Sequence, residues 1–340
     1  MPFHYLIFLF TLCISPFAFS SDNYRTRFNQ EIVPFWQTGV HKMVPGHDGV
    51  LLHTLSFPLK GAKGNILIAH GFTETVMKYM ETALDFHNKG FGVYLYEHRG
   101  HGLSKAMAKE KGLVHVDQFN SYVEDMKVVA DTLLDPKAKR LLLAHSMGGG
   151  IAAGFLDQYP AYFDAAVLNA PMLEMNTRGV PGWAIKLVGR IYRLFGLGES
   201  MLPGQSLPPE SGRFVFSKAT GTSDRERYAA YQDYLLATEG YVRLGAGTVH
   251  WMLEALSFLE GVLEREDLGH IKTPVKVVQA ELDIYVKPEG QKRFCEKLPF
   301  CDLEVFKGSR HEVYLERPAV RDGWLAAVTG FYQTQINRKI

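Results

Sequence analysis

The chain has 340 residues, of which 46% are hydrophobic and 21% charged, a composition that excludes a disordered or fibrous protein and supplies a large core. Its 37 basic and 36 acidic residues leave a formal charge of +1, so nothing in the charge balance favours nucleic-acid binding, and we expect none. The length allows two domains, although a single α/β domain also reaches this size.

Residues 5–19 form an uncharged apolar segment, YLIFLFTLCISPFAF. This run is broken by Pro16 and is shorter than the roughly 20 residues of a membrane-spanning helix. Small residues stand at Ala18 and Ser20, and the chain becomes polar directly afterwards. We expect residues 1–20 to be a cleaved signal peptide, which predicts a periplasmic or secreted protein. The alternative is an uncleaved peripheral membrane anchor.

Short apolar runs then alternate with longer segments of helical periodicity, which predicts a mostly parallel sheet with crossover helices. Several of the runs are apolar almost throughout, as strands buried on both faces are. We expect strands at 51–57, 65–70, 92–97, 140–145, 165–169, 275–280 and 303–307. We expect helices near 77–89, 117–134, 148–158 and 318–336.

The alternation is interrupted between residues 172 and 270. Pro and Gly residues interrupt this stretch at several points. Its amphipathic segments lie near 183–195, 224–237 and 248–263. Its aromatic content favours a helical cap over the strand ends rather than a simple surface excursion. We therefore predict a core made of residues 21–171 and 271–340, with a cap at 172–270 inserted before the last strands.

Two cysteines, Cys295 and Cys301, lie outside the N-terminal segment. In an oxidising compartment they could pair across the six positions that separate them. The alternative is a pair of buried reduced thiols, since a large core needs no disulfide.

The sequence RLLLAHSMGGG at 140–150 places Ser146 between a predicted strand and a glycine-rich helix start. A nucleophile elbow has this order, because its sharp turn leaves little room for side chains two positions on either side of the Ser. The first of these positions is Ala144 rather than Gly, and a methyl group is tolerable there. The pattern predicts Ser146 as a nucleophile.

A Ser hydroxyl becomes an effective nucleophile when a His takes its proton and a carboxylate orients that His. In this kind of sheet the acid and then the His follow the Ser, each in a loop after a strand. The strand predicted at 275–280 is followed by Glu281 and Asp283, and the strand predicted at 303–307 is followed by His311. We predict Asp283 as the acid and His311 as the base, with Glu281 as the alternative acid.

The oxyanion that forms during acyl transfer needs backbone N–H donors. The amide of Met147, directly after the Ser, is one candidate. The second should come from the loop after an early strand, here His70-Gly71-Phe72, where glycine permits close backbone approach. We assign it to the Phe72 amide.

The segment EHRGHG at 97–102 contains His98 and His101. Metal-binding helices place two His residues four positions apart on one face, whereas this is a glycine-broken loop after a strand. We therefore predict no metal site here and no cofactor.

Together these motifs resemble the monoglyceride lipase and lysophospholipase branch of the serine α/β-hydrolases, and within it the bacterial lysophospholipases. The resemblance spans about residues 30–335. The motifs that carry it are HGFTE at 70–74, YEHRGHGLS at 96–104, AHSMGG at 144–149, LNAPM at 168–172, QAELD at 279–283 and GSRHEVYLE at 308–316. The resemblance implies an α/β-hydrolase fold and a cap that guides one acyl chain to Ser146.

The resemblance also implies a serine ester hydrolase acting on lysophospholipids or related single-chain glycerolipids, with possible association with a membrane surface. The alternatives are a monoacylglycerol lipase, a general carboxylesterase, an aminopeptidase and a non-catalytic hydrolase homologue. An aminopeptidase would need acidic cap residues facing the pocket, and the cap offers Asp233, Glu254 and Glu260. A non-catalytic homologue usually lacks a triad member, and each predicted member is present.

Glu74 and Lys78 fall where relatives place polar groups near the glycerol end of the substrate. One hypothesis is that Lys78 meets a phosphate and Glu74 a head-group ammonium. The alternative is an i,i+4 ion pair between the two side chains.

Overall fold

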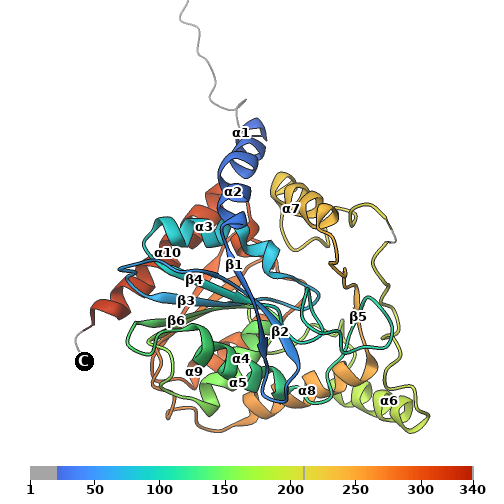
Figure 1. The fold of residues 1–340 in the computed structure, drawn as a ribbon. Helices are drawn as coiled ribbons and strands as arrows, with labels where there is room; N and C mark the ends of the chain where they lie inside the picture. Colours follow the sequence, from blue (N-terminus) through green and yellow to red (C-terminus); the bar gives the residue numbers. More distant parts are fainter. Residues whose placement is uncertain (1–20, 210, 339–340) are drawn as a thin grey trace, which may run out of the picture.

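The structure is a computed structural model that describes residues 21–209 and 211–338 (Figure 1). Eight strands form one sheet in the order β1-β2-β4-β3-β6-β7-β9-β10. The first three in this order are antiparallel to one another, and every other neighbouring pair is parallel. The strands are β1 (Val40–Pro45), β2 (Leu51–Phe57), β3 (Asn65–Ala69), β4 (Gly92–Tyr96), β6 (Arg140–His145), β7 (Ala165–Asn169), β9 (Val275–Ala280) and β10 (Cys301–Phe306). The predicted α/β class and mostly parallel sheet are confirmed.

Helices cover both faces of this sheet (Figure 1). The central strands β3 and β7 are buried along their whole length, which explains why they read as continuous apolar runs in the sequence. One face packs against α4 (Asn120–Leu133), α5 (Met147–Gln158) and α9 (Pro288–Glu296). The other packs against α2 (Val33–Gln37), α3 (Met80–Asn88) and α10 (Pro318–Asn337). Two hydrophobic cores therefore hold the sheet between them.

Two elements near the N-terminus were not predicted. Strand β1 pairs antiparallel with β2 at the sheet edge and is exposed at five of its six residues, so it has no apolar pattern to detect. Helix α1 (Ser21–Arg27) continues through a π-helical turn, Phe28–Ile32, into α2. Three apolar side chains anchor this segment: Phe28, Ile32 and Trp36 are buried. The predicted signal peptide, residues 1–20, lies outside the described residues.

The stretch between β7 and β9 contains the three helices expected there. They are α6 (Gly182–Leu194), α7 (Arg225–Ala237) and α8 (Val249–Glu264). A short parallel pair, β5 (Leu113–Val114) with β8 (Ala246–Gly247), connects this stretch to the loop that follows β4. Within the described part of the chain, every helix is too short or too polar to span a bilayer.

Cys295 and Cys301 form a disulfide in the structure, with their Cα atoms 5.4 Å apart. The bond joins the last turn of α9 to the first residue of β10. Of the two alternatives left open by the sequence, a disulfide or two reduced thiols, the structure contains the disulfide.

Candidate active site

Ser146 lies at the turn between β6 and α5. Its backbone has φ 51° and ψ −117°, and residues other than glycine rarely adopt such a positive φ. The turn needs glycine at position 148, because a Cβ atom there would lie 2.5 Å from the carbonyl oxygens of Ala69 and His70. The backbone N–H of Ser146 donates to the Asn169 carbonyl at 3.1 Å, which ties the turn to the end of β7. The structure thus contains the strained strand–turn–helix that the sequence predicted.

Asp283 and His311 meet beyond the ends of β9 and β10. Nδ1 of His311 lies 2.6 Å from Oδ2 of Asp283. The other carboxylate oxygen accepts hydrogen bonds from the backbone N–H groups of Tyr285 at 2.8 Å and Val286 at 3.2 Å. Burial opposes ionisation of Asp283, but His311 and these amides outweigh it and lower the pKa of the carboxyl group. Asp283 is therefore held as a carboxylate, in one orientation, against the imidazole.

Glu281, the alternative acid, is oriented elsewhere. Its side chain accepts a hydrogen bond from the backbone N–H of Gly308 at 2.7 Å and is exposed to solvent. It braces the loop that carries His311 without touching the imidazole. The structure therefore brings Asp283 rather than Glu281 to His311.

Ser146 and His311 line one cavity of about 360 Å³. The two residues assigned as oxyanion donors flank the same Ser, since Met147 is the first residue of α5 and Phe72 follows β3. A Cβ atom at Gly71 would lie 3.1 Å from the Cβ atom of Ser146, so the loop after β3 passes against the nucleophile turn. Phe72 closes one wall of this cavity. These positions bring the five predicted reaction residues to one edge of the sheet.

Glu74 is fully engaged by the protein. One carboxylate oxygen accepts from the Gly71 backbone N–H at 2.7 Å and from the Tyr79 hydroxyl at 3.0 Å. The other accepts from Lys78 at 2.7 Å and from the Tyr314 hydroxyl at 3.1 Å. Burial works against the charged form, yet Lys78 and the other donors keep the pKa of Glu74 below its usual range. The carboxylate therefore shapes the loop that carries the Phe72 amide.

Lys78 is mostly buried, with 11% of its side chain exposed, and lies between two carboxylates. Its ammonium group lies 2.7 Å from Glu74 and 2.7 Å from Glu312, the residue after His311. Burial and the neighbouring Glu74 raise the pKa of Glu312. The i,i+4 ion pair considered from the sequence is present, and the second contact of Lys78, with Glu312, extends it into a partly buried link between the oxyanion loop and the His311 loop. Glu312 had no sequence signal beyond its place beside His311.

His145 is a further neighbour that the sequence analysis did not single out. Its ring centroid lies 4.7 Å from that of His311, and burial lowers the pKa of His145 to about 3. The ring is therefore neutral at pH 7 and packs against His311 without competing for its proton. Its position immediately before Ser146 was the only available signal.

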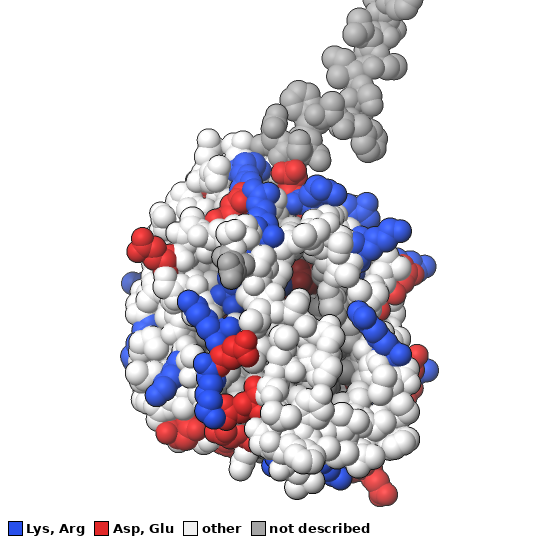
Figure 2. Space-filling model, turned by 90° about the vertical axis from the view of Figure 1, so that its right-hand side faces the viewer, with Lys and Arg blue, Asp and Glu red and all other residues white. Residues whose placement is uncertain are grey.

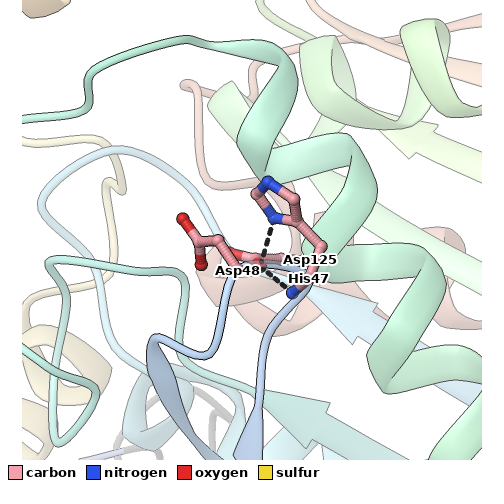
Figure 3. A group of neighbouring side chains, drawn as sticks. All are labelled: His47, Asp48 and Asp125. Carbon is pink, nitrogen blue, oxygen red and sulfur yellow. Dashed lines mark hydrogen bonds and ion pairs between the residues drawn. The ribbon is translucent and has the colours of Figure 1, made fainter.

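Three side chains elsewhere have the composition of a metal site: His47, Asp48 and Asp125 have ligand atoms within 4.8 Å of one another (Figure 3). They lie at the β1–β2 turn and on α4. Arg99 donates to Asp125 at 2.7 Å and to Asp48 at 2.9 Å, so a guanidinium already neutralises both carboxylates. This cluster ties the loop after β4 to its neighbours.

The fold and the juxtaposition of Ser146, His311 and Asp283 are those of a serine hydrolase with the α/β-hydrolase fold. The family model described as serine aminopeptidase, S33, matches residues 60–318, and the chain belongs to that family.

Curated relatives and solved structures agree with this family. Lysophospholipase L2 of Escherichia coli K12 is 30% identical over 315 residues, covering 88% of this chain and 89% of the relative. Human monoglyceride lipase is 25% identical, covering 77% of this chain and 80% of the relative. A soluble variant of monoglyceride lipase from Saccharomyces cerevisiae has the same fold, with a TM-score of 0.65 and 16% identity over 87% of this chain and 96% of that one. The resemblance inferred from the sequence motifs is confirmed.

Proposed function

We propose that the protein is a serine ester hydrolase that releases a fatty acid from lysophospholipids or related single-chain glycerolipids. The observation that carries the proposal is the 2.6 Å contact between His311 and Asp283 in loops that bring the imidazole to the cavity of Ser146. The relative named lysophospholipase L2, matched along almost its whole length, supports the substrate class.

The chemistry follows from these positions. The hydroxyl oxygen of Ser146 attacks the ester carbonyl while His311 takes the hydroxyl proton, and Asp283 stabilises the imidazolium. The amides of Phe72 and Met147 donate to the oxyanion of the tetrahedral intermediate. The intermediate collapses to an acyl-enzyme as His311 protonates the departing glycerol oxygen. Water then attacks the acyl-enzyme with His311 as base, and the fatty acid leaves.

The cavity of Ser146 is apolar on the side of the inserted helices. Met175, Ile185 and Met252 line it there, and Ile185 and Met252 also line a second cavity of about 380 Å³ beneath α6. The second cavity is lined mainly by aliphatic side chains. These adjoining apolar walls are suited to a single acyl chain.

The acidic residues of the inserted helices favour an ester hydrolase over an aminopeptidase. Asp233 pairs with Arg25 and Arg213, and Glu260 pairs with Lys186. Neither of these carboxylates, nor Glu254, lines the cavity of Ser146. A free amino terminus of a peptide would therefore find no carboxylate there from these helices.

Association with a lipid surface is part of the proposal. Helix α6 exposes large apolar side chains, with Trp183 70%, Leu187 53% and Leu194 84% exposed. Figure 2 shows a broad uncharged area on the face of the molecule where α6 lies. Exposed apolar patches of this kind mark interaction sites, and the cavity beneath this one shares its wall with the cavity of Ser146. The exposed apolar side chains of α6 would thus bring the cavity beneath α6, and next to it the cavity of Ser146, close to a lipid surface.

The disulfide between Cys295 and Cys301 supports the proposal that the protein is periplasmic or secreted, because such bonds persist in oxidising compartments. A direct check is to locate the protein and determine the N-terminus of its mature form. Cleavage after residue 20 is the expected result.

The direct contact of Lys78 with phosphate and of Glu74 with an ammonium group remains a hypothesis that competes with the ion pair. Both oxygens of Glu74 are hydrogen-bonded within the protein, which favours the ion pair as its main role. Lys78→Ala distinguishes the two, since equal losses on lysophospholipid and monoacylglycerol would remove the phosphate contact.

The activity itself is tested by labelling with a fluorophosphonate and by a substrate panel. Wild type should be labelled and Ser146→Ala should not. The purified protein should hydrolyse 1-acyl lysophospholipids and monoacylglycerols faster than short nitrophenyl esters, because only the long chains fill the apolar space. Undiminished labelling of Ser146→Ala would refute the mechanism, and a preference for short esters would favour the general carboxylesterase.

A further inference from the structure

A polar cavity of about 270 Å³ adjoins the cavity of Ser146 on the side away from α6. It lies between α7, the loop at 214–221 and the segment at 241–245. Thr73, Lys78, Tyr285 and Glu312 line both cavities, so the two spaces are neighbours with a shared wall. The nucleophile therefore stands between an apolar space under α6 and a polar space beside α7.

This arrangement matches the two ends of an amphiphilic ester. When the acyl chain occupies the apolar space, the alcohol part of the substrate points toward the polar one. Four tyrosines (Tyr228, Tyr231, Tyr241 and Tyr285), Gln232 and Arg243 are among the residues that line that polar space, and their side chains carry hydroxyl, amide and guanidinium groups. Such groups donate hydrogen bonds, which suits an oxygen-rich head group.

The two cations of the polar cavity differ in how far they are already neutralised. Lys78 contacts the carboxylates of Glu74 and Glu312, so an anion approaching it also meets two negative charges. Arg243 instead donates to backbone carbonyls, those of Gly212 at 2.6 Å and of Pro209. In the described ranges 21–209 and 211–338, no carboxylate lies at ion-pair distance from its guanidinium.

Among the residues that the structure describes, Arg243 therefore has only backbone carbonyls as hydrogen-bond partners, and it lines a cavity that adjoins the cavity of the nucleophile. A guanidinium has five N–H donors, and the two carbonyl contacts leave others for a second partner. Its planar donor array matches a phosphate better than an ammonium group does. A substrate without phosphate gains nothing from this charge.

We infer that the cavity beside α7 is the head-group compartment and that Arg243 in it contacts the phosphate of a lysophospholipid. The inference rests on the proposed function and adds to it a residue that separates lysophospholipids from monoacylglycerols.

The experiment compares Arg243→Gln with wild type on three substrates that carry the same acyl chain. Lysophosphatidylcholine and lysophosphatidylglycerol both contain the phosphate, and monoacylglycerol does not. Glutamine retains an amide donor for the carbonyls of the 209–212 loop. We expect kcat/KM to fall about tenfold or more on both lysophospholipids, mainly through KM, and to stay within about twofold on monoacylglycerol.

Arg213→Gln is the matched control, because it removes the same charge from the same region. Arg213 pairs with Asp233 at 2.6 Å and does not line the polar cavity, so this variant should keep the substrate preference of wild type. Arg243→Lys should recover part of the lost activity, since it restores the charge without the planar donor array.

Equal losses on all three substrates would overturn the inference, because they would show that Arg243 only holds the loop. A loss restricted to lysophosphatidylglycerol would also overturn it, since both lysophospholipids carry the phosphate. Failure of the proposed function is a different result, in which wild type itself hydrolyses a nitrophenyl ester but none of the three lipids.

Discussion

Replacing Gly148 by alanine is the most direct test of how the nucleophile turn is built. The new Cβ atom would stand 2.5 Å from the carbonyl oxygens of Ala69 and His70, about 0.9 Å inside ordinary van der Waals contact. Both obstacles are backbone atoms, so no side-chain rotation relieves the clash. Overpacking of this kind costs about 1–3 kcal/mol, and we expect about 3 kcal/mol here because a strand end must move.

The same movement should impair catalysis. The strand end that is displaced leads directly into the loop that carries the Phe72 amide, one of the two proposed oxyanion donors. Loss of one such donor lowers kcat about a hundredfold or more. Urea unfolding measures the stability change, and hydrolysis of a soluble nitrophenyl ester measures the rate.

Gly330→Ala supplies the control. Gly330 lies in α10, and a Cβ atom there has nothing within 4 Å. Alanine in a helix is better than glycine, so this variant should be about 0.5–1 kcal/mol more stable than wild type and equally active. A Gly148→Ala protein with the stability and rate of wild type would refute the steric account of the turn.

Three further predictions concern the acid, a buried histidine and the disulfide. Asp283→Asn should lower kcat on the order of 10³–10⁴-fold with little change in KM, because the amide cannot stabilise the imidazolium; an unchanged kcat on the nitrophenyl ester would contradict the assignment. Burial lowers the pKa of His101 to about 3, so between pH 6.5 and 3 the unfolded chain binds a proton there that the folded protein does not. The free energy of unfolding should therefore fall as the pH falls through this window, by up to about 1.4 kcal/mol per pH unit. Urea denaturation of His101→Gln at pH 7 and pH 5 should show a smaller loss of stability than wild type. An equal loss in both proteins would contradict the role of His101. Replacing Cys295 and Cys301 together by Ser should cost about 2 kcal/mol of stability and leave ester hydrolysis unchanged, which thermal unfolding with and without reductant checks.

Prediction from the sequence was most accurate where a residue's role depends on its place relative to a strand. The strands β3, β6 and β7 are five or six residues long and mostly apolar, and the loops that follow them lie at one edge of the sheet. Strand β1 was missed because it lies at the sheet edge, where five of its six residues are exposed to solvent. An exposed edge strand has no apolar alternation to report its presence.

Side-chain partners across the chain were less accessible. His145 could be noticed only as the neighbour of Ser146, and Glu312 only as the neighbour of His311. The bond between Lys78 and Glu312 joins residues 234 positions apart, and no periodicity connects them. Such contacts depend on how loops from different strands approach one another, which local patterns do not encode.

The amino-acid sequence alone determined the α/β class, the nucleophile turn, and the order in which Ser146, an acidic loop and His311 follow one another. Each follows from strand periodicity and from the need for small residues at a sharp turn. The tertiary structure decided which carboxylate of the 281–283 loop reaches the imidazole. It also showed that both carboxylate oxygens of Glu74 are hydrogen-bonded within the protein. It further showed that, among the described residues, Arg243 contacts backbone carbonyls rather than a carboxylate in the cavity next to that of Ser146. Charge neutralisation depends on distances of a few ångströms between distant segments, and only the folded chain defines those distances.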